Sequence, residues 1–314
     1  MPDWAIEQGI GETRAARIVG GEIVESRILL GGITRAGARL SARLKSVGPP
    51  AIAEAQGAEY LLPKGARGVD EGAALVIEVT REAIPGAEPW KRPLAVVSPD
   101  SAAPAPALDG ATLPFPAPYD ALGTAGWWDL IEEARSGVVR FAGGELRISA
   151  TPAMTLIDVD GHLPPAELAV AGAREAARAL LRLDIGGSVG IDLPTSGSRG
   201  ARQDAAAAID AILPQPLERT AVNGFGFVQI VRPRLRASLV ELAQDRAAFE
   251  ARALLRRAAL DVPGARRIVA HPAVIASLAD RNKWLEQLSR QIGGAIELRA
   301  DAAVPMSGGY AESL

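Results

Sequence analysis

The amino-acid sequence predicts an α/β fold, and the stretch from residue 154 to residue 192 carries most of that prediction. Two short apolar runs, residues 154–159 and 187–191, are typical of buried strands. Between them, Pro164–Pro165 marks the start of a helix and Gly186–Gly187 marks its end. A strand–helix–strand unit of this length is a right-handed crossover, so we expect the two strands to be parallel and adjacent.

Each of these two strands ends in an aspartate, Asp158 in the first and Asp192 in the second. Open α/β sheets bind their ligands at the carboxyl ends of the strands, and neighbouring strands lie about 4.8 Å apart. We therefore expect the two carboxylates to lie close enough to share one hard cation.

The composition limits the classes of protein that the chain can belong to. Its 314 residues are enough for about two domains, and with 48% hydrophobic but 4% aromatic residues the core must be mostly aliphatic. The absence of cysteine excludes disulfides and thiolate metal sites, and only two histidines, His162 and His271, argue against structural zinc.

Neither a membrane span nor a basic-then-apolar leader is evident, so we expect a cytoplasmic protein with no membrane partner. A net charge of −3 provides no overall attraction to nucleic acid. Any nucleic-acid binding must therefore use a local patch of charge.

The first third of the chain reads as β structure. Residues 13–29 form two short strands around Gly20–Gly21, which is a hairpin signal. The β-like runs that follow, separated by Gly and Pro, indicate a small barrel. These residues leave two interpretations open, an OB-type nucleic-acid module or a small β domain of no assigned function. Residues 98–118 are rich in Pro, Ala and Ser and should hold no regular element.

Around the central unit, we expect a helix over residues 127–135, a hairpin over 138–149 and a helix over 201–213. The polar loop before this last helix carries Arg199 and Arg202. It is either a solvated connection or a substrate contact.

A basic stretch follows. The strand in NGFGFVQIVRPRLRASL should place Arg232, Arg234 and Arg236 on one side of an extended chain. From Arg219 to Arg257, eight arginines stand against three acids, a local balance of +5. Such runs are often solvated faces, but next to the two aspartates this one favours phosphate binding.

The last part of the chain predicts a long helix over residues 240–260 and then a second, smaller strand–helix–strand unit. Its elements fall on residues 266–270, 273–290 and 295–300. We assign His271, which precedes Pro272, to the capping of the helix in this unit.

Two known families resemble the central segment. IDVDGHL resembles the first motif of haloacid-dehalogenase-type phosphatases, in which the first aspartate is a nucleophile and the second an acid/base. That family also needs a downstream lysine and a later acidic pair. Beyond Asp160 the only lysine is Lys283, and no Gly-Asp-x-x-x-Asp pattern is present, so we rank this resemblance second.

The more extensive resemblance, over most of the chain, is to the ribonuclease E/G family. TRAARIVGGEIVESRI resembles the family's opening hairpin, GGITRAGARLSARL its inserted OB module, and VVRFAGGELRISATPAMTLIDVDG the approach to its catalytic strand. The most specific matches, in order and spacing, are AREAARALLRLDIGGSVGID and NGFGFVQIVRPRLRASL.

This resemblance implies a DNase-I-like/RNase-H-like catalytic core with an inserted OB-fold-like β module and a small C-terminal α/β domain. The implied boundaries are 1–27 for an N-terminal hairpin packing on the core, 28–86 for the RNA-binding module, 87–126 for a Pro-rich connection, 127–258 for the core and 259–314 for the end domain.

The resemblance also implies an activity. Family members bind Mg²⁺ through two aspartates at the ends of core strands, and these fall on Asp158 and Asp192, with Asp160 as an auxiliary catalytic residue. The implied reaction is hydrolysis of single-stranded RNA by a metal-activated water, for which hard oxygen ligands are suited. The arginines that could contact RNA phosphates are Arg140 (by its place in the resemblance), Arg199, Arg202, Arg232, Arg234 and Arg236.

The chain also departs from the family pattern. Asp160 stands where the family has asparagine, and the aromatics on which the OB module stacks RNA fall on Leu44 and Leu61. The segment that reads a 5′-monophosphate and the Cys-Pro-x-Cys zinc link are missing, so no zinc-linked tetramer is expected and a homodimer stays open. These departures keep a second class open, a non-catalytic RNA-binding or regulatory homologue.

Overall fold

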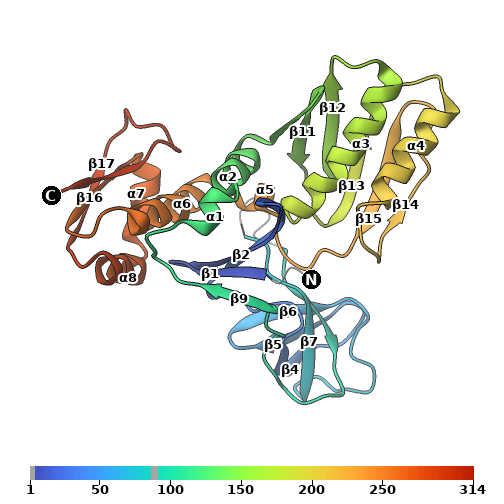
Figure 1. Ribbon diagram of the computed structural model, residues 1–314. Coiled ribbons are helices and arrows are strands. Elements are labelled where there is room, and N and C mark those ends of the chain that lie inside the picture. Colours follow the sequence, from blue (N-terminus) through green and yellow to red (C-terminus); the bar gives the residue numbers. More distant parts are fainter. Residues whose placement is uncertain (1–3, 86–90) are drawn as a thin grey trace. The chain divides into compact units, whose positions relative to one another are not determined.

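The computed structural model describes residues 4–85 and 91–314 (Figure 1). Contacts divide the chain into two compact units, each assembled from segments that are distant in sequence. The first comprises Met1–Gly31, Asp109–Ile131 and Leu242–Leu314, and the second Gly32–Leu108 and Glu132–Glu241. No helix in these described ranges is long and apolar enough to cross a membrane.

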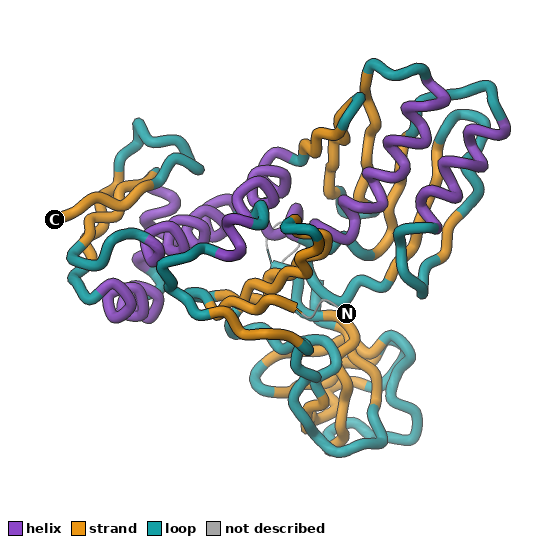
Figure 2. Tube along the Cα trace, viewed as in Figure 1, coloured by secondary structure: helices purple, strands orange, loops and turns teal. Residues whose placement is uncertain are grey.

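A closed five-stranded barrel forms the first part of the second unit, and loops join its short strands (Figure 2). Burial alternates along its strands, and Leu44, Leu62 and Ile77 fill its interior. The small barrel expected from the sequence is confirmed, but its last strand lies beyond residue 86. The strands, in barrel order, are β4 (Arg39–Ser46), β5 (Ala51–Ala55), β6 (Ala58–Leu62), β8 (Leu94–Val97) and β7 (Ala74–Arg81).

A six-stranded sheet forms the rest of this unit. Only its central pair, β12 with β13, is parallel, and every other neighbouring pair is antiparallel. In spatial order the strands are β10 (Val138–Phe141), β11 (Gly144–Ala150), β12 (Thr155–Gly161), β13 (Gly187–Asp192), β15 (Phe227–Arg232) and β14 (Glu218–Arg219).

Helix α3 (Pro165–Arg182) connects the two parallel strands, which confirms the expected crossover, and it lies beside α4 (Arg199–Asp210) on one face of the sheet (Figure 1). Gly172 allows this close packing, because a Cβ there would lie 2.3 Å from Cγ1 of Val159. The side chains of Ile157 and Val159 are therefore buried under α3, whereas the alternate residues of β12 are exposed.

The first unit contains a four-stranded sheet, a three-stranded sheet and several helices. A buried ionic network holds it together, in which Arg256 contacts Glu7 and Asp120, and Arg252 contacts Glu12. Its sheets are β3 (Glu22–Leu30), β2 (Glu12–Val19), β1 (Trp4–Gln8) and β9 (Gly110–Leu113), and β17 (Ile296–Ala300), β16 (Arg266–Ala270) and β18 (Tyr310–Ser313). Its helices include α1 (Ala121–Thr124), α6 (Arg246–Leu260), α7 (Pro272–Ala279) and α8 (Asn282–Ile292), while α2 (Trp127–Ser136) and α5 (Leu239–Leu242) span the boundaries of the units.

Three expectations about single elements were wrong. Residues 98–118 do hold a strand, because β9 pairs in parallel with β1 through backbone hydrogen bonds that do not depend on side-chain type. The helix expected over residues 240–260 is broken, since Asp245 caps a new helix by accepting a hydrogen bond from the Ala248 amide. The helix expected over residues 273–290 is divided into α7 and α8.

Candidate metal and nucleic-acid site

The two aspartates at the strand ends lie directly opposite each other. In the parallel pairing of β12 with β13, Asp158 is in register with Asp192. Residues in register on neighbouring strands project from the same face of a sheet, about 4.8 Å apart along the hydrogen-bonding direction. The expected adjacency of these two acids is therefore confirmed.

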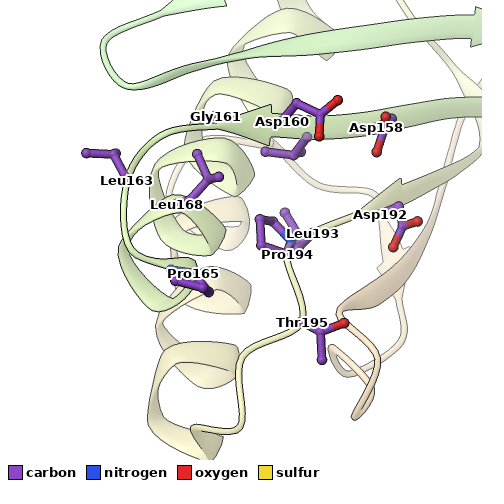
Figure 3. A pocket seen from close by; sticks show the side chains of 11 residues that line it. Asp158, Asp160, Gly161, Leu163, Pro165, Leu168, Asp192, Leu193, Pro194 and Thr195 are labelled. Atoms are coloured by element: carbon purple, nitrogen blue, oxygen red, sulfur yellow. The ribbon is translucent and has the colours of Figure 1, made fainter.

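Both aspartates lie on the exposed face of the sheet, away from α3 (Figure 3). Their chain neighbours Ile157, Val159 and Ile191 are buried on the opposite face. A hollow of about 420 Å³ begins at the acids and continues along the end of the sheet. The residues that line it are Asp158, Val159, Asp160, Gly161, Leu163, Pro165, Leu168, Asp192, Leu193, Pro194 and Thr195.

The acids at this strand end repel one another. Partial burial raises the pKa of Asp158, and the nearby carboxylates of Asp160 and Asp192 raise it further. A raised pKa means that the ionised form is disfavoured at this position. A bound cation would relieve the repulsion by neutralising the charge.

The donors fit a magnesium ion that retains several waters. Mg²⁺ prefers carboxylate oxygens and is usually held by one or two carboxylates plus water and substrate phosphates. Within residues 4–85 and 91–314, no group of three or more His, Cys, Asp or Glu side chains could hold a metal ion. Asp158 and Asp192, which lie in register, supply two carboxylates, within the number that magnesium usually takes from a protein.

A cross-strand row that sequence reasoning missed passes through the two aspartates. Arg147 is in register with Asp158, which is in register with Asp192, which is in register with Phe227. Arg147 is largely exposed, and its guanidinium lies 2.7 Å from a carboxylate oxygen of Glu145 and 3.9 Å from one of Asp160. The acidic pair is therefore flanked by the guanidinium of Arg147 on the Asp158 side and by Phe227 on the Asp192 side.

Arg140 lies on the same face, in a second row. It is in register with Glu145, which is in register with Asp160. The Arg140 side chain is 85% exposed, and its Nε is 4.0 Å from the Glu145 carboxylate. Arg140 is thus a cation presented to solvent on the sheet face that carries the acids.

The expected row of Arg232, Arg234 and Arg236 beside the acids was wrong. Strand β15 runs antiparallel to β13, so Arg232 is opposite Gly187, whereas Phe227 is opposite Asp192. At about 3.3 Å per residue, Arg232 lies roughly 17 Å along the sheet from the Asp192 position. The strand also ends at Arg232, so the three arginines do not share one side of an extended chain.

These three arginines make internal contacts instead. Arg232 donates to the carbonyl of Ile185 at 2.9 Å, and Arg234 pairs with Glu241. Arg236 pairs with Asp184 at 3.0 Å and lies 3.6 Å from the buried carboxylate of Glu82. Others of the basic stretch are paired as well: Arg219 with Asp210, Arg252 with Glu12 and Arg256 with Glu7 and Asp120. Six of the eight arginines in this stretch therefore make contacts within the fold.

The two arginines of the loop after Asp192 differ from each other. Arg202 donates to the carbonyl of Ser196 at 3.2 Å and so shapes the loop. Arg199 is exposed in the first turn of α4, whose N-cap is Ser198. Arg199 therefore remains a candidate phosphate contact.

The barrel presents little for base stacking. Leu44, where the resemblance places a stacking aromatic, is fully buried in the barrel interior, and Leu61 is half-buried. Tyr60, the aromatic residue in the described part of the barrel, is also buried.

No family model and no curated protein matches the chain. Function must therefore be inferred from the residues of the site.

Proposed function

We propose that the protein is a magnesium-dependent endoribonuclease that cleaves single-stranded RNA with a metal-activated water. The proposal includes a DNase-I-like/RNase-H-like nuclease core in the six-stranded sheet and an OB-like role for the barrel. The observation that carries it is the registration of Asp158 with Asp192 at the ends of two parallel strands, on an exposed face. The sequence resemblance to the ribonuclease E/G family supports the same two residues as magnesium ligands.

A magnesium ion held there would polarise a phosphoryl oxygen and lower the pKa of a bound water. In this proposal Asp158 and Asp192 supply the protein oxygens that hold the ion. Asp160 lines the same hollow and is exposed, so its carboxylate can accept a hydrogen bond from the attacking water. Arg140 and Arg147 lie on the same face and can hold flanking phosphates through paired N–H donors.

A second candidate function is RNA binding without cleavage. The ion pair between Asp160 and Arg147 favours it, because this contact competes with any role of Asp160 in directing a water. The phosphatase alternative gains no support, since the sequence after Asp160 has no Gly-Asp-x-x-x-Asp pattern for the later acidic pair.

The test is a cleavage assay with a fluorescently end-labelled single-stranded RNA in magnesium, with and without EDTA. Wild type is compared with Asp158→Asn and Asp192→Asn, and with Asp204→Asn as a matched control at an exposed position of α4. We expect EDTA-sensitive cleavage that both site variants lose and the control keeps. Binding without cleavage would favour the second candidate, and neither binding nor cleavage would overturn both.

A further inference from the structure

The side chain of Phe225 is unusually exposed. It is 81% exposed, more than any other large hydrophobic residue in the described ranges. Burial of a phenylalanine side chain is worth about 1.5–3 kcal/mol, so a bare ring forgoes a stabilising contact. An exposed ring in a well-ordered segment indicates a surface that binds a ligand or partner.

The segment that carries Phe225 is a well-formed hairpin tip between β14 and β15. The Asn223 amide donates to the Phe227 carbonyl, and the Gly226 amide donates back to the Asn223 carbonyl. The side-chain oxygen of Asn223 accepts hydrogen bonds from the amides of Phe225 at 2.9 Å and Phe227 at 3.0 Å. The ring therefore projects from a braced turn.

The tip is also hydrogen-bonded to the segment that follows Asp192. The Thr195 hydroxyl donates to the Phe225 carbonyl at 2.8 Å, and the Leu193 amide donates to the Gly226 carbonyl at 3.3 Å. Gly226 has a φ of +97°, and a Cβ there would lie 2.1 Å from the Leu193 carbonyl oxygen. Leu193 and Thr195 line the hollow that contains the aspartates, so the tip borders the candidate metal site.

The surroundings of the ring suit a flat partner. A Cβ added at Gly224, or at Gly197 in the loop after Asp192, would meet nothing within 4 Å. A docking surface for a folded protein needs a contiguous apolar patch, whereas Phe225 is flanked in the chain by two glycines. A single aromatic ring with open space beside it is the arrangement on which bases of single-stranded nucleic acid stack.

We propose that Phe225 is the stacking platform for one nucleobase of a single-stranded RNA whose phosphate lies at the magnesium ion that Asp158 and Asp192 would hold. This inference rests on the proposed function and names how its substrate is held. A base in a strand lies one sugar away from its phosphate, so a phosphate held at the strand ends brings a neighbouring base to the hairpin tip. Bases of a duplex are already stacked on one another, so the platform selects single strands.

The experiment measures cleavage and binding of a fluorescent oligouridine by wild type, Phe225→Ala, Phe225→Leu and Phe225→Tyr. Tyr119→Ala, which removes another exposed aromatic ring, is the matched control. Stacking contributes about 1–3 kcal/mol per base, so Phe225→Ala should raise KM in cleavage by roughly five- to a hundredfold, and should raise Kd in magnesium by the same factor if the RNA is bound but not cleaved. Tyr should restore binding, whereas Leu, which is apolar but not aromatic, should not. Thermal unfolding of every variant should match wild type, because the ring is exposed.

The outcomes separate this inference from the proposed function. RNA cleavage that is equally efficient in wild type and Phe225→Ala would overturn the platform and leave the nuclease intact. Rescue by Leu would also overturn it, because an apolar contact would then suffice. RNA binding that Phe225→Ala weakens, in a protein that cleaves nothing, would overturn the nuclease and support the platform. An abasic site introduced at successive positions of the RNA should weaken binding to wild type as much as Phe225→Ala does, at one position only.

Discussion

The two ends of strand β13 carry charge for different purposes. At its carboxyl end, Asp192 faces Asp158 on an exposed surface, and burial together with the neighbouring carboxylates raises the pKa of Asp158. At its amino end, where Gly187 is opposite Arg232, the arginines are paired with carbonyls and carboxylates of the same unit. The carboxylates at the carboxyl end of β13 thus repel one another, whereas the arginines near its amino end form ion pairs that stabilise the fold.

This comparison shows that charge density along the sequence is a poor guide to a binding site. The arginine-rich stretch is the most conspicuous charge feature of the sequence, yet most of its guanidinium groups make contacts within the fold. The aspartates that the described chain places at the end of the sheet are only three, Asp158, Asp160 and Asp192, yet the pKa of Asp158 is raised by the other two carboxylates. A ligand binds where the fold leaves charge uncompensated, and the two ends can be tested separately.

The largest effect is expected at the acidic end. Asp158→Asn should lower cleavage by roughly 10²-fold or more, since metal stabilisation of the transition state is worth several kcal/mol. The same variant should unfold at an equal or higher temperature than wild type, because it removes a repelled charge. Magnesium should raise the unfolding temperature of wild type and not of Asp158→Asn. A variant that loses stability and keeps its response to magnesium would contradict the shared site.

The opposite pattern is expected at the arginine end. Arg236→Met should destabilise the fold by about 2–4 kcal/mol, because it leaves Asp184 and the buried Glu82 without their guanidinium. Cleavage by the folded fraction should stay within about twofold of wild type. Urea unfolding measures the loss of stability, and the cleavage assay measures the activity of the folded fraction. As a control, Arg178→Met removes an exposed i,i+3 contact with Glu175 and should cost less than about 0.5 kcal/mol.

Local patterns were sufficient to predict the crossover and its two aspartates. A strand–helix–strand unit of this length has one handedness, and the acids sit at equivalent strand ends, so their adjacency follows without knowledge of any distant contact. The barrel was predictable in the same way, from short strands separated by Gly and Pro.

Features that depend on long-range register were not predictable. The position of Arg147 beside Asp158 follows from the pairing of β11 with β12, and that of Arg232 from the direction of β15, neither of which the sequence states. Pairing of the arginines depends on partners as distant as Glu82. The break before α6, by contrast, had a local signal that was overlooked, since Asp245 is a good N-cap residue.

A smaller effect is expected from the missed arginine. Arg147→Ala removes an exposed cation next to the acids, so it should weaken RNA binding without regard to sequence and lower the slope of log affinity against log salt by about one. The change in stability should stay within about 0.5 kcal/mol, because the side chain is largely exposed. Fluorescence anisotropy over a range of salt concentrations measures the slope. An unchanged slope would place the RNA phosphates elsewhere on the protein.

The smallest effect is a pH dependence at the arginine end. Burial raises the pKa of Glu82, and the attraction of Arg236 opposes this rise only in part. A carboxyl group whose pKa is higher in the folded than in the unfolded chain binds its proton more tightly when folded. Its contribution to stability is therefore complete below the unfolded pKa of about 4.3 and is lost as the pH rises through the folded pKa. Urea unfolding in steps above pH 4.3 should show a decline that Glu82→Gln flattens. If Glu82→Gln instead steepens the decline, the pairing with Arg236 outweighs burial, and the arginine end stabilises the fold more strongly than the present contacts imply.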